Sequence, residues 1–315
     1  MAALDRPQLL AIAPLYAPAL AEVERKFIVH RRAGIGQDEL PAPIRERIRG
    51  VITTGLRGFS APDLEPLPNL EIVACFGQGH GTLDVAAARA RGVIVTNTPE
   101  WTHEAVADVA LGLMLGVMRR LCEADRFVRA GRWLDGAFPM STDLRGKTCG
   151  VIGLGAIGRA VARRAEMFGM SVVYHGPSPK ADVRWRHYPE LAEMAADADC
   201  LVVACAVTPS THRLIDRRIL SALGPKGYLI NVSRGAIVDQ PALIKALQSR
   251  AIAGAGLEVF DDEPRVPVEL RALEQVMLLP HLGSSTHEIR AERTARLLAN
   301  LRAHFAGQPP PDRVV

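Results

Sequence analysis

The glycine run at residues 153–158, Gly-Leu-Gly-Ala-Ile-Gly, constrains the fold of this 315-residue chain more than any other feature. An apolar run that predicts a strand ends at Ile152, and residues 156–167 have the spacing of a helix. Between a strand and a helix, the first glycine permits a tight turn, the second admits a pyrophosphate, and the third lets the two elements pack closely. The helix N-terminus offers N–H groups to phosphate. The run therefore predicts a dinucleotide-binding turn; the alternative is a structural turn without a ligand.

The position of this turn in the middle of the chain implies another folded unit before it. Short apolar runs alternate with amphipathic segments on both sides of the turn, which is typical of parallel α/β sheets. We predict two doubly wound parallel-sheet domains. The first should be discontinuous, at residues 1–98 and 288–315, because the last helical pattern is too long for a tail. The second, a Rossmann dinucleotide-binding domain at residues 99–287, is inserted into the first and contains a long helical pattern at 102–130.

Composition argues against several other classes of protein. A net charge of +4 with only 5% aromatic residues is not the signature of a nucleic-acid groove. The five cysteines are odd in number and form no C-x-x-C pair, which argues against a metal site. Neither a signal peptide nor an apolar stretch of about 18 residues is visible, so we expect no membrane association. We expect a cytoplasmic protein that acts on a small molecule.

Three residues that can carry chemistry come just after predicted strands of the second domain: Arg234, Glu263 and His281. Ligands of open parallel sheets bind beyond the carboxyl ends of the strands, so all three should lie at the nucleotide end of the sheet. Arginine binds a carboxylate bidentately, and histidine exchanges a proton near neutral pH. A neighbouring carboxylate favours the charged form of histidine. Hydride transfer to a 2-keto acid requires these roles; the alternative is three surface charges at strand ends.

Several motifs follow one another in a specific order. They are the glycine run and then NVSRG, VFDDEP and PHLGSST at residues 231–235, 259–264 and 280–286. In this order they resemble the D-isomer-specific 2-hydroxyacid dehydrogenases. Segments 92–99 and 105–108 of the chain resemble that family as well, so the likeness covers nearly the whole sequence. Segments 124–133 and 222–227 are most similar to the glyoxylate/hydroxypyruvate reductases and the hydroxyphenylpyruvate reductases.

The resemblance implies an NAD(P)-dependent enzyme that reduces a small 2-keto acid, of the glyoxylate or hydroxypyruvate type, to the D-2-hydroxy acid. It implies that His281 protonates the carbonyl oxygen, that Glu263 hydrogen-bonds His281, and that Arg234 binds the substrate carboxylate. Backbone N–H groups at Gln78 and Gly79 would bind the same carboxylate. Formate dehydrogenases of this superfamily carry glutamine at the acidic position, so Glu263 argues against that reaction.

The chain departs from the family pattern at the substrate loop, residues 76–81. Gly81 stands where an acidic residue is usual, Gln78 where a smaller apolar residue is commoner, and Trp101 where an aliphatic residue is common. These positions line or flank the substrate pocket, so the identity of the keto acid stays open. Glu258 replaces the usual aspartate beside the nicotinamide amide, which keeps an acceptor on a longer arm.

The strand after the glycine turn ends at His175 without an acidic residue. A carboxylate there would bind the ribose hydroxyls of NAD and repel the 2′-phosphate of NADP. Ser178 and Lys180 can bind that phosphate, although Pro177 stands where NADPH-dependent reductases usually have arginine. We favour NADP over NAD; the alternative is a relaxed site that uses both. The expected cofactor contacts are Gly153, Leu154, Gly155, Ala156, Ile157, Gly158, His175, Ser178, Lys180, Val232, Ser233, Arg234, Glu258, His281 and Gly283.

Other functions remain as alternatives. A nucleotide-sensing binding protein or co-regulator on the same scaffold belongs to a different class. Within enzymes, hydroxyphenylpyruvate reductase and phosphoglycerate dehydrogenase are possible, and the latter is disfavoured because no regulatory domain follows the last helical pattern. We also expect a homodimer, because the pattern at 102–130 is apolar over more of its surface than one domain needs and two-fold dimers are the commonest oligomers.

Overall fold

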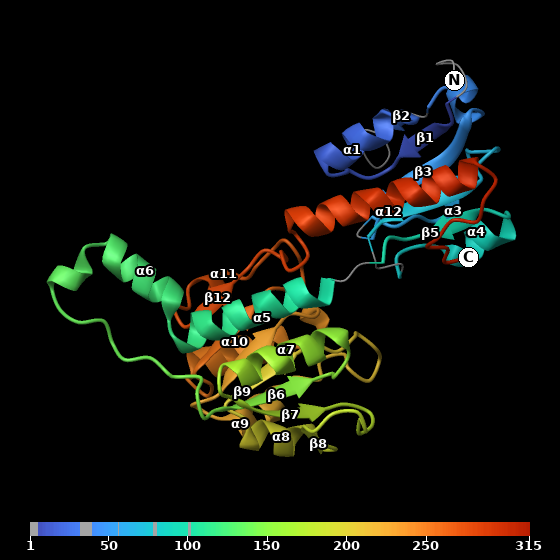
Figure 1. The fold of residues 1–315 in the computed structure, drawn as a ribbon. Coiled ribbons are helices and arrows are strands. Elements are labelled where there is room, and N and C mark those ends of the chain that lie inside the picture. Colours follow the sequence, from blue (N-terminus) through green and yellow to red (C-terminus); the bar gives the residue numbers. More distant parts are fainter. Residues whose placement is uncertain (1–5, 32–39, 56, 78–80, 100–101) are drawn as a thin grey trace. The chain divides into compact units, whose positions relative to one another are not determined.

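The computed structural model describes residues 6–31, 40–55, 57–77, 81–99 and 102–315. The chain forms two compact units, one of residues 1–101 with 285–315 and one of residues 102–284. The second unit is inserted into the first, and each has its own parallel sheet (Figure 1). The unit boundaries lie at 101/102 and 284/285, whereas the sequence placed them at 98/99 and 287/288.

The second unit is built on a seven-stranded sheet. Its strands are β6 (Thr148–Ile152), β7 (Ser171–His175), β8 (Arg186–Tyr188), β9 (Cys200–Val203), β10 (Tyr228–Asn231), β11 (Gly254–Leu257) and β12 (Val276–Leu278). They lie in the order β12-β11-β10-β9-β6-β7-β8, and all neighbours are parallel. This is the Rossmann order, with its reversal between β6 and β9, where ligands of such sheets bind. The predicted α/β fold with an inserted Rossmann domain is confirmed.

Helices cover both faces of this sheet, and each face has its own apolar core. Successive side chains of a strand point to opposite faces, so Val151 belongs to one core and its neighbour Ile152 to the other. On the first face lie α5 (Thr102–Met118) and α7 (Ala156–Met167). On the second face lie α8 (Leu191–Asp197), α9 (Arg217–Leu223) and α10 (Gln240–Gln248), and the short α11 (Val268–Arg271) contributes Leu270.

The long helical pattern at 102–130 forms two helices rather than one. α5 ends at Met118, and α6 (Leu121–Arg129) begins after Arg120, whose φ of 56° is left-handed. A left-handed residue cannot continue a right-handed helix, so the chain changes direction there. In Figure 1, α6 projects away from the body of its unit, followed by the short 3-10 helix η2 (Arg132–Leu134).

The first unit has a five-stranded parallel sheet in the order β2-β1-β3-β4-β5. Its C-terminal helix α12 buries Leu297, Leu298 and Leu301 against this sheet, which is why the domain is discontinuous. The described helices include none that is long and apolar enough to cross a membrane. The elements are β1 (Gln8–Ala11), α1 (Ala17–Glu24), β2 (Ile28–Arg31), α2 (Ala42–Arg45), β3 (Ile48–Thr54), α3 (Ala61–Leu64), β4 (Ile72–Phe76), α4 (Val85–Ala90), β5 (Ile94–Thr96) and α12 (His287–Phe305).

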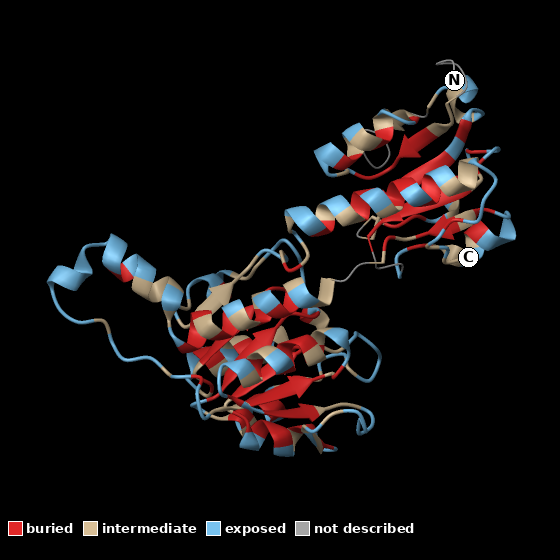
Figure 2. Cartoon of the chain, in the orientation of Figure 1, coloured by how far each residue is buried: buried red, intermediate tan, exposed pale blue. Residues whose placement is uncertain are grey.

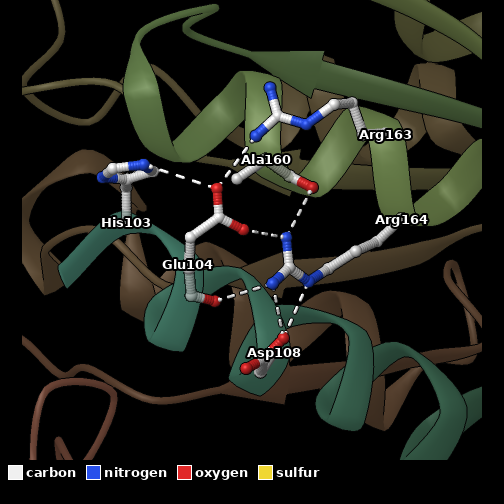
Figure 3. A network of polar contacts seen from close by, with 6 residues as sticks. All are labelled: His103, Glu104, Asp108, Ala160, Arg163 and Arg164. Atoms are coloured by element: carbon white, nitrogen blue, oxygen red, sulfur yellow. Dashed lines mark hydrogen bonds and ion pairs between the residues drawn. The ribbon is translucent and has the colours of Figure 1, made fainter. Parts of the chain in front are cut away.

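A polar network joins the first turn of α5 to α7 (Figure 3). The Arg164 guanidinium lies 2.7 Å from Glu104 Oε2 and 2.7 Å from Asp108 Oδ1, and Arg163 lies 2.9 Å from Glu104 Oε1. Hydrogen bonding from Arg164 holds the pKa of Glu104 below its ordinary value. The network therefore fixes the helix that follows the glycine turn to the helix that begins the inserted unit.

Glu104→Gln should lower the free energy of unfolding by about 0.5 kcal/mol at neutral pH, the usual scale of exposed ion pairs. The folded pKa of Glu104 is depressed, so its contribution is present above the ordinary glutamate pKa of 4.5 and disappears as the pH falls below it. Urea unfolding at several pH values measures this difference. Glu269→Gln, at an exposed residue with no ion pair among the described residues, is the matched control; an equal loss in both variants contradicts the prediction.

Candidate active site

The glycine turn has the geometry that a dinucleotide requires. Gly153 has a φ of 92°, and a Cβ atom there would lie 2.6 Å from the Cys205 backbone. A Cβ at Gly158 would lie 2.1 Å from the Gly153 carbonyl oxygen, so α7 packs directly on the turn. By contrast, no atom lies within 4 Å of a Cβ built at Gly155, which begins α7 without a side-chain cap. Open space in front of an uncapped helix N-terminus fits a pyrophosphate.

The other expected contacts at this turn differ in exposure. The Leu154 side chain is buried, Ile157 is half-buried and Ala156 is exposed. Val232 and Ser233 follow β10, on the other side of the reversal, and both are buried. The Ser233 hydroxyl donates to the Cys205 carbonyl, which connects the loop after β10 to the loop after β9.

His281 and Glu263 form a hydrogen-bonded pair. His281 Nδ1 lies 2.7 Å from Glu263 Oε2, and the other carboxylate oxygen, Oε1, accepts from the backbone N–H of Phe260 at 3.1 Å. Because Glu263 is held through both oxygens, it fixes the orientation of the imidazole ring. The second ring nitrogen, Nε2, is left for another partner. His281 also has a left-handed φ of 52°, uncommon for a residue with a Cβ, and outliers of this kind cluster at functional sites.

Arg234 comes from the loop after β10. Its guanidinium donates to the Ser233 carbonyl at 2.7 Å, and the side chain is exposed. Asn231 holds this loop, since its Nδ2 donates to the Arg234 carbonyl at 3.0 Å and its Oδ1 accepts from the Ser233 N–H at 3.1 Å. A Cβ at Gly235 would lie 2.0 Å from the Phe260 backbone, so the Arg234 loop packs against the loop that leads to Glu263.

Glu258 is the buried carboxyl between these groups. Its side chain accepts a hydrogen bond from the Gly283 N–H, and its carbonyl accepts one from the His281 N–H at 3.0 Å. Burial raises the pKa of Glu258, and the negative charge of Glu263 acts in the same direction. The Gly283 N–H and the positive charges of His281 and Arg234 act in the opposite direction. The charges of all three candidate catalytic residues therefore act on Glu258, although Arg234 forms no hydrogen bond or ion pair with His281 or Glu263.

An apolar pocket adjoins the pair. Its lining includes Phe260, Pro264, Leu278 and Leu279, together with the Glu263 and His281 side chains. Apolar walls limit the access of water to the His281–Glu263 pair. In the described part of the chain, no cluster of histidine, cysteine and acidic side chains could hold a metal ion.

At the same carboxyl edge of the sheet, but on the other side of the reversal, the loop after β7 carries the residues expected to select between NADP and NAD. His175 is half-buried, whereas Ser178 and Lys180 are exposed, and the Lys180 N–H donates to the Tyr174 hydroxyl at 2.6 Å. No atom lies within 4 Å of a Cβ built at Gly176. The predicted substrate residues Gln78 and Gly79, and Trp101, lie outside the described residues.

Sequence reasoning missed the residues that position the site. Asn231 fastens the Arg234 loop, Gly235 lets it approach the Glu263 loop, and Cys205 packs behind Gly153. The glycine directly after Arg234 was the available signal, because a glycine beside a functional residue often marks a close backbone approach. Asn231 and Cys205 carried no comparable signal, since their roles depend on which strands are neighbours.

Comparison with known proteins agrees with this arrangement. Residues 111–283 match the family model of the D-isomer specific 2-hydroxyacid dehydrogenase, NAD binding domain. The chain belongs to this family. It is therefore a nicotinamide-dependent oxidoreductase, as predicted from the motif order.

Individual relatives cover most of the chain. It is 46% identical to glyoxylate/hydroxypyruvate reductase A of Arabidopsis thaliana over 264 residues. The aligned region covers 84% of this chain and 84% of the relative. It is 43% identical over 301 residues to hydroxyphenylpyruvate reductase of Plectranthus scutellarioides, covering 95% of this chain and 96% of the relative. Among solved structures, it is similar to an NADPH-dependent glyoxylate/hydroxypyruvate reductase from Sinorhizobium meliloti in complex with NADP and malonate. That comparison gives a TM-score of 0.87 and 41% identity, covering 99% of this chain and 97% of the other.

Proposed function

We propose that this enzyme reduces a small 2-keto acid of the glyoxylate or hydroxypyruvate type to the D-2-hydroxy acid, with NADPH preferred. The observation that carries the proposal is the oriented His281–Glu263 pair, 2.7 Å apart, at the carboxyl edge of the sheet that also bears the glycine turn. The relatives named above, reductases of glyoxylate, hydroxypyruvate and hydroxyphenylpyruvate, support the substrate class. We assign nucleotide binding to residues 102–284, which also carry Arg234 and His281, and we assign further substrate contacts to the other unit.

Each residue of the trio has a distinct role in this proposal. Arg234 binds the substrate carboxylate bidentately and orients the keto group. His281 gives the proton on Nε2 to the carbonyl oxygen, as a general acid. Glu263 acts through His281, because it holds Nδ1 and thereby directs Nε2 to the substrate. The nicotinamide, when bound, supplies the hydride. Backbone N–H groups of Gln78 and Gly79 are proposed to hold the carboxylate as well.

Cofactor binding is assigned to the turn and to the strand ends around it. Gly155 and the first amides of α7 receive the pyrophosphate, while Ser178 and Lys180 bind a 2′-phosphate in a loop without a carboxylate at the strand end. The NADP-bound relative supports NADPH as the preferred cofactor. None of the cysteines forms a disulfide among the described residues, which suits the reducing cytoplasm in which we place the enzyme.

A substrate panel tests the proposal directly. Oxidation of NADPH and NADH is followed with glyoxylate, hydroxypyruvate, hydroxyphenylpyruvate and phosphohydroxypyruvate. We expect the highest kcat/KM for one of the first two. Hydroxyphenylpyruvate is the second candidate, because a relative with that activity aligns over 95% of the chain and the pocket beside His281 is apolar. NADPH binding without turnover of any acid favours the nucleotide-sensing alternative.

His281→Ala should lower kcat at least about 100-fold, the usual scale for loss of a general acid. Binding of NADPH, measured by fluorescence titration, should change little, because no proposed phosphate contact is altered. His287→Ala, at an exposed histidine outside the trio, is the matched control and should keep normal turnover. Near-normal kcat in a folded His281→Ala variant would remove this residue from the mechanism.

We further propose that the enzyme is a homodimer that pairs through the arm formed by α6, η2 and the following loop. This arm projects from its unit and is largely exposed (Figures 1 and 2). It displays apolar side chains to solvent, with exposed fractions of 52% for Leu121, 54% for Val128, 68% for Trp133 and 94% for Leu134. Several large apolar side chains exposed on one projecting segment are typical of an interaction surface.

Light scattering at micromolar concentration should give twice the chain mass of 34.0 kDa. A charged residue in a desolvated interface is unfavourable, so Val128→Asp combined with Leu134→Asp should shift the mass towards that of one chain. The exposed but separate substitution Met167→Asp is the control, and it should leave the mass unchanged. A wild-type protein that is monomeric across this concentration range contradicts the proposal.

The wild-type enzyme should have a higher kcat/KM for NADPH than for NADH. Gly176→Asp should reverse this preference, because a carboxylate repels the 2′-phosphate and there is open space for the side chain. Gly176→Asn has nearly the same size without the charge and should keep the preference. If the wild type prefers NADH tenfold or more, about 1.4 kcal/mol of discrimination, another group holds the ribose hydroxyls.

A further inference from the structure

Two histidines flank the loop between β7 and β8, and each is fixed by a main-chain carbonyl. His175 Nδ1 lies 2.9 Å from the Tyr188 carbonyl oxygen, and His187 Nε2 lies 3.0 Å from the Gly176 carbonyl oxygen. A carbonyl oxygen can only accept, so both of these ring nitrogens carry a proton and donate. The remaining nitrogens, Nε2 of His175 and Nδ1 of His187, make no hydrogen bond to a described residue.

This arrangement lets each imidazole change charge without breaking its contact. The neutral ring with its proton on the bonded nitrogen and the imidazolium both donate to the same carbonyl. Protonation therefore adds a positive charge to the loop while the loop keeps its conformation. His187 donates to Gly176 itself, and His175 occupies the strand end where NAD-selective sheets place a carboxylate.

Charged groups of both signs surround the two rings. In the loop and on α7, Asp182 is paired with Arg159 at 2.9 Å, and Glu166 with Arg184 at 2.8 Å. The positive charge of Lys180 also lies close enough to Asp182 to act on its carboxylate. On β8, Arg186 stacks over the Tyr188 ring at 4.3 Å, and Tyr174 accepts from the Lys180 N–H. The acidic residues on α8 and at its N-cap are Glu190, Glu193 and Asp197. Asp197 accepts a hydrogen bond from the Tyr188 hydroxyl at 2.7 Å.

We infer that His175 and His187 make the choice between NADP(H) and NAD(H) depend on pH, with the preference for the 2′-phosphorylated cofactor rising as the solution becomes more acidic. The inference rests on the proposed nicotinamide-dependent function. An imidazole gains a positive charge when it is protonated, so protonation of either ring adds positive charge beside the phosphate. The phosphate itself has a second pKa near 6 and loses negative charge on acidification, which acts in the opposite direction. A rise in preference must therefore come from the protein.

Direct binding tests this inference without relying on turnover. The dissociation constants of NADP⁺ and NAD⁺ are measured by calorimetry from about pH 8 to about pH 5.5, and their ratio cancels effects on the shared pyrophosphate. Each half-exposed histidine should raise the preference about two- to fivefold, the scale of partly exposed ion pairs. In His175→Asn the amide keeps a donor near the Nδ1 position, and in His187→Gln near the Nε2 position. Each variant should lose part of the rise, and the double variant should lose all of it.

His212→Asn, at an exposed histidine elsewhere in the same unit, is the matched control and should keep the full rise. The inference is overturned if the wild-type ratio of the NADP⁺ and NAD⁺ dissociation constants does not change with pH. It is also overturned if the double variant shows the same rise in preference as the wild type. Failure of both cofactors to bind would instead contradict the proposed function. The two failures are therefore distinguishable in one experiment.

Discussion

The rest of the site depends on the close packing of Gly158 against the Gly153 carbonyl oxygen in the second unit. A side chain at Gly158 would start 2.1 Å from that oxygen, so any larger residue would move α7 away from β6. Tightly packed interiors do not absorb such a shift. Because Arg164 also joins α7 to the first turn of α5, this one contact places both the phosphate-binding end of α7 and the helix that begins the unit.

The sequence predicted the parallel sheets, the strand and helix on either side of the glycine turn, and the loops that carry Arg234, Glu263 and His281. These features depend on local periodicity and on the rule that ligands gather at the carboxyl ends of parallel strands. The break between α5 and α6 was not predictable in the same way, because the apolar spacing continues through Arg120 and neither glycine nor proline marks the turn. β8 has only three residues at a sheet edge and depends on pairing with β7.

The electrostatic interactions of the site could not be predicted from the sequence motifs. From the sequence, Glu258 is only a longer replacement for aspartate. In the structure, burial raises the pKa of Glu258, and the Gly283 N–H and the cationic neighbours lower it. The longer arm allows the carboxyl to reach the Gly283 N–H while its own carbonyl holds the His281 N–H. A single residue thus supports the strained backbone at His281 and contributes to the local field. That dual role follows from tertiary packing, which residue type alone does not encode.

The seven-stranded sheet separates two groups of residues. The His281–Glu263 pair follows β11 and β12, whereas the loop with Ser178 and Lys180 follows β7, on the other side of the reversal between β6 and β9. A dinucleotide has its reacting ring at one end and its 2′ position at the other, so this separation matches the two halves of the ligand. Loop residues such as Pro177, Ser178 and Lys180 can therefore differ from the family pattern without disturbing the His281–Glu263 pair. The proposed trio is therefore compatible with proline at residue 177, where the resemblance implies arginine in NADPH-dependent reductases.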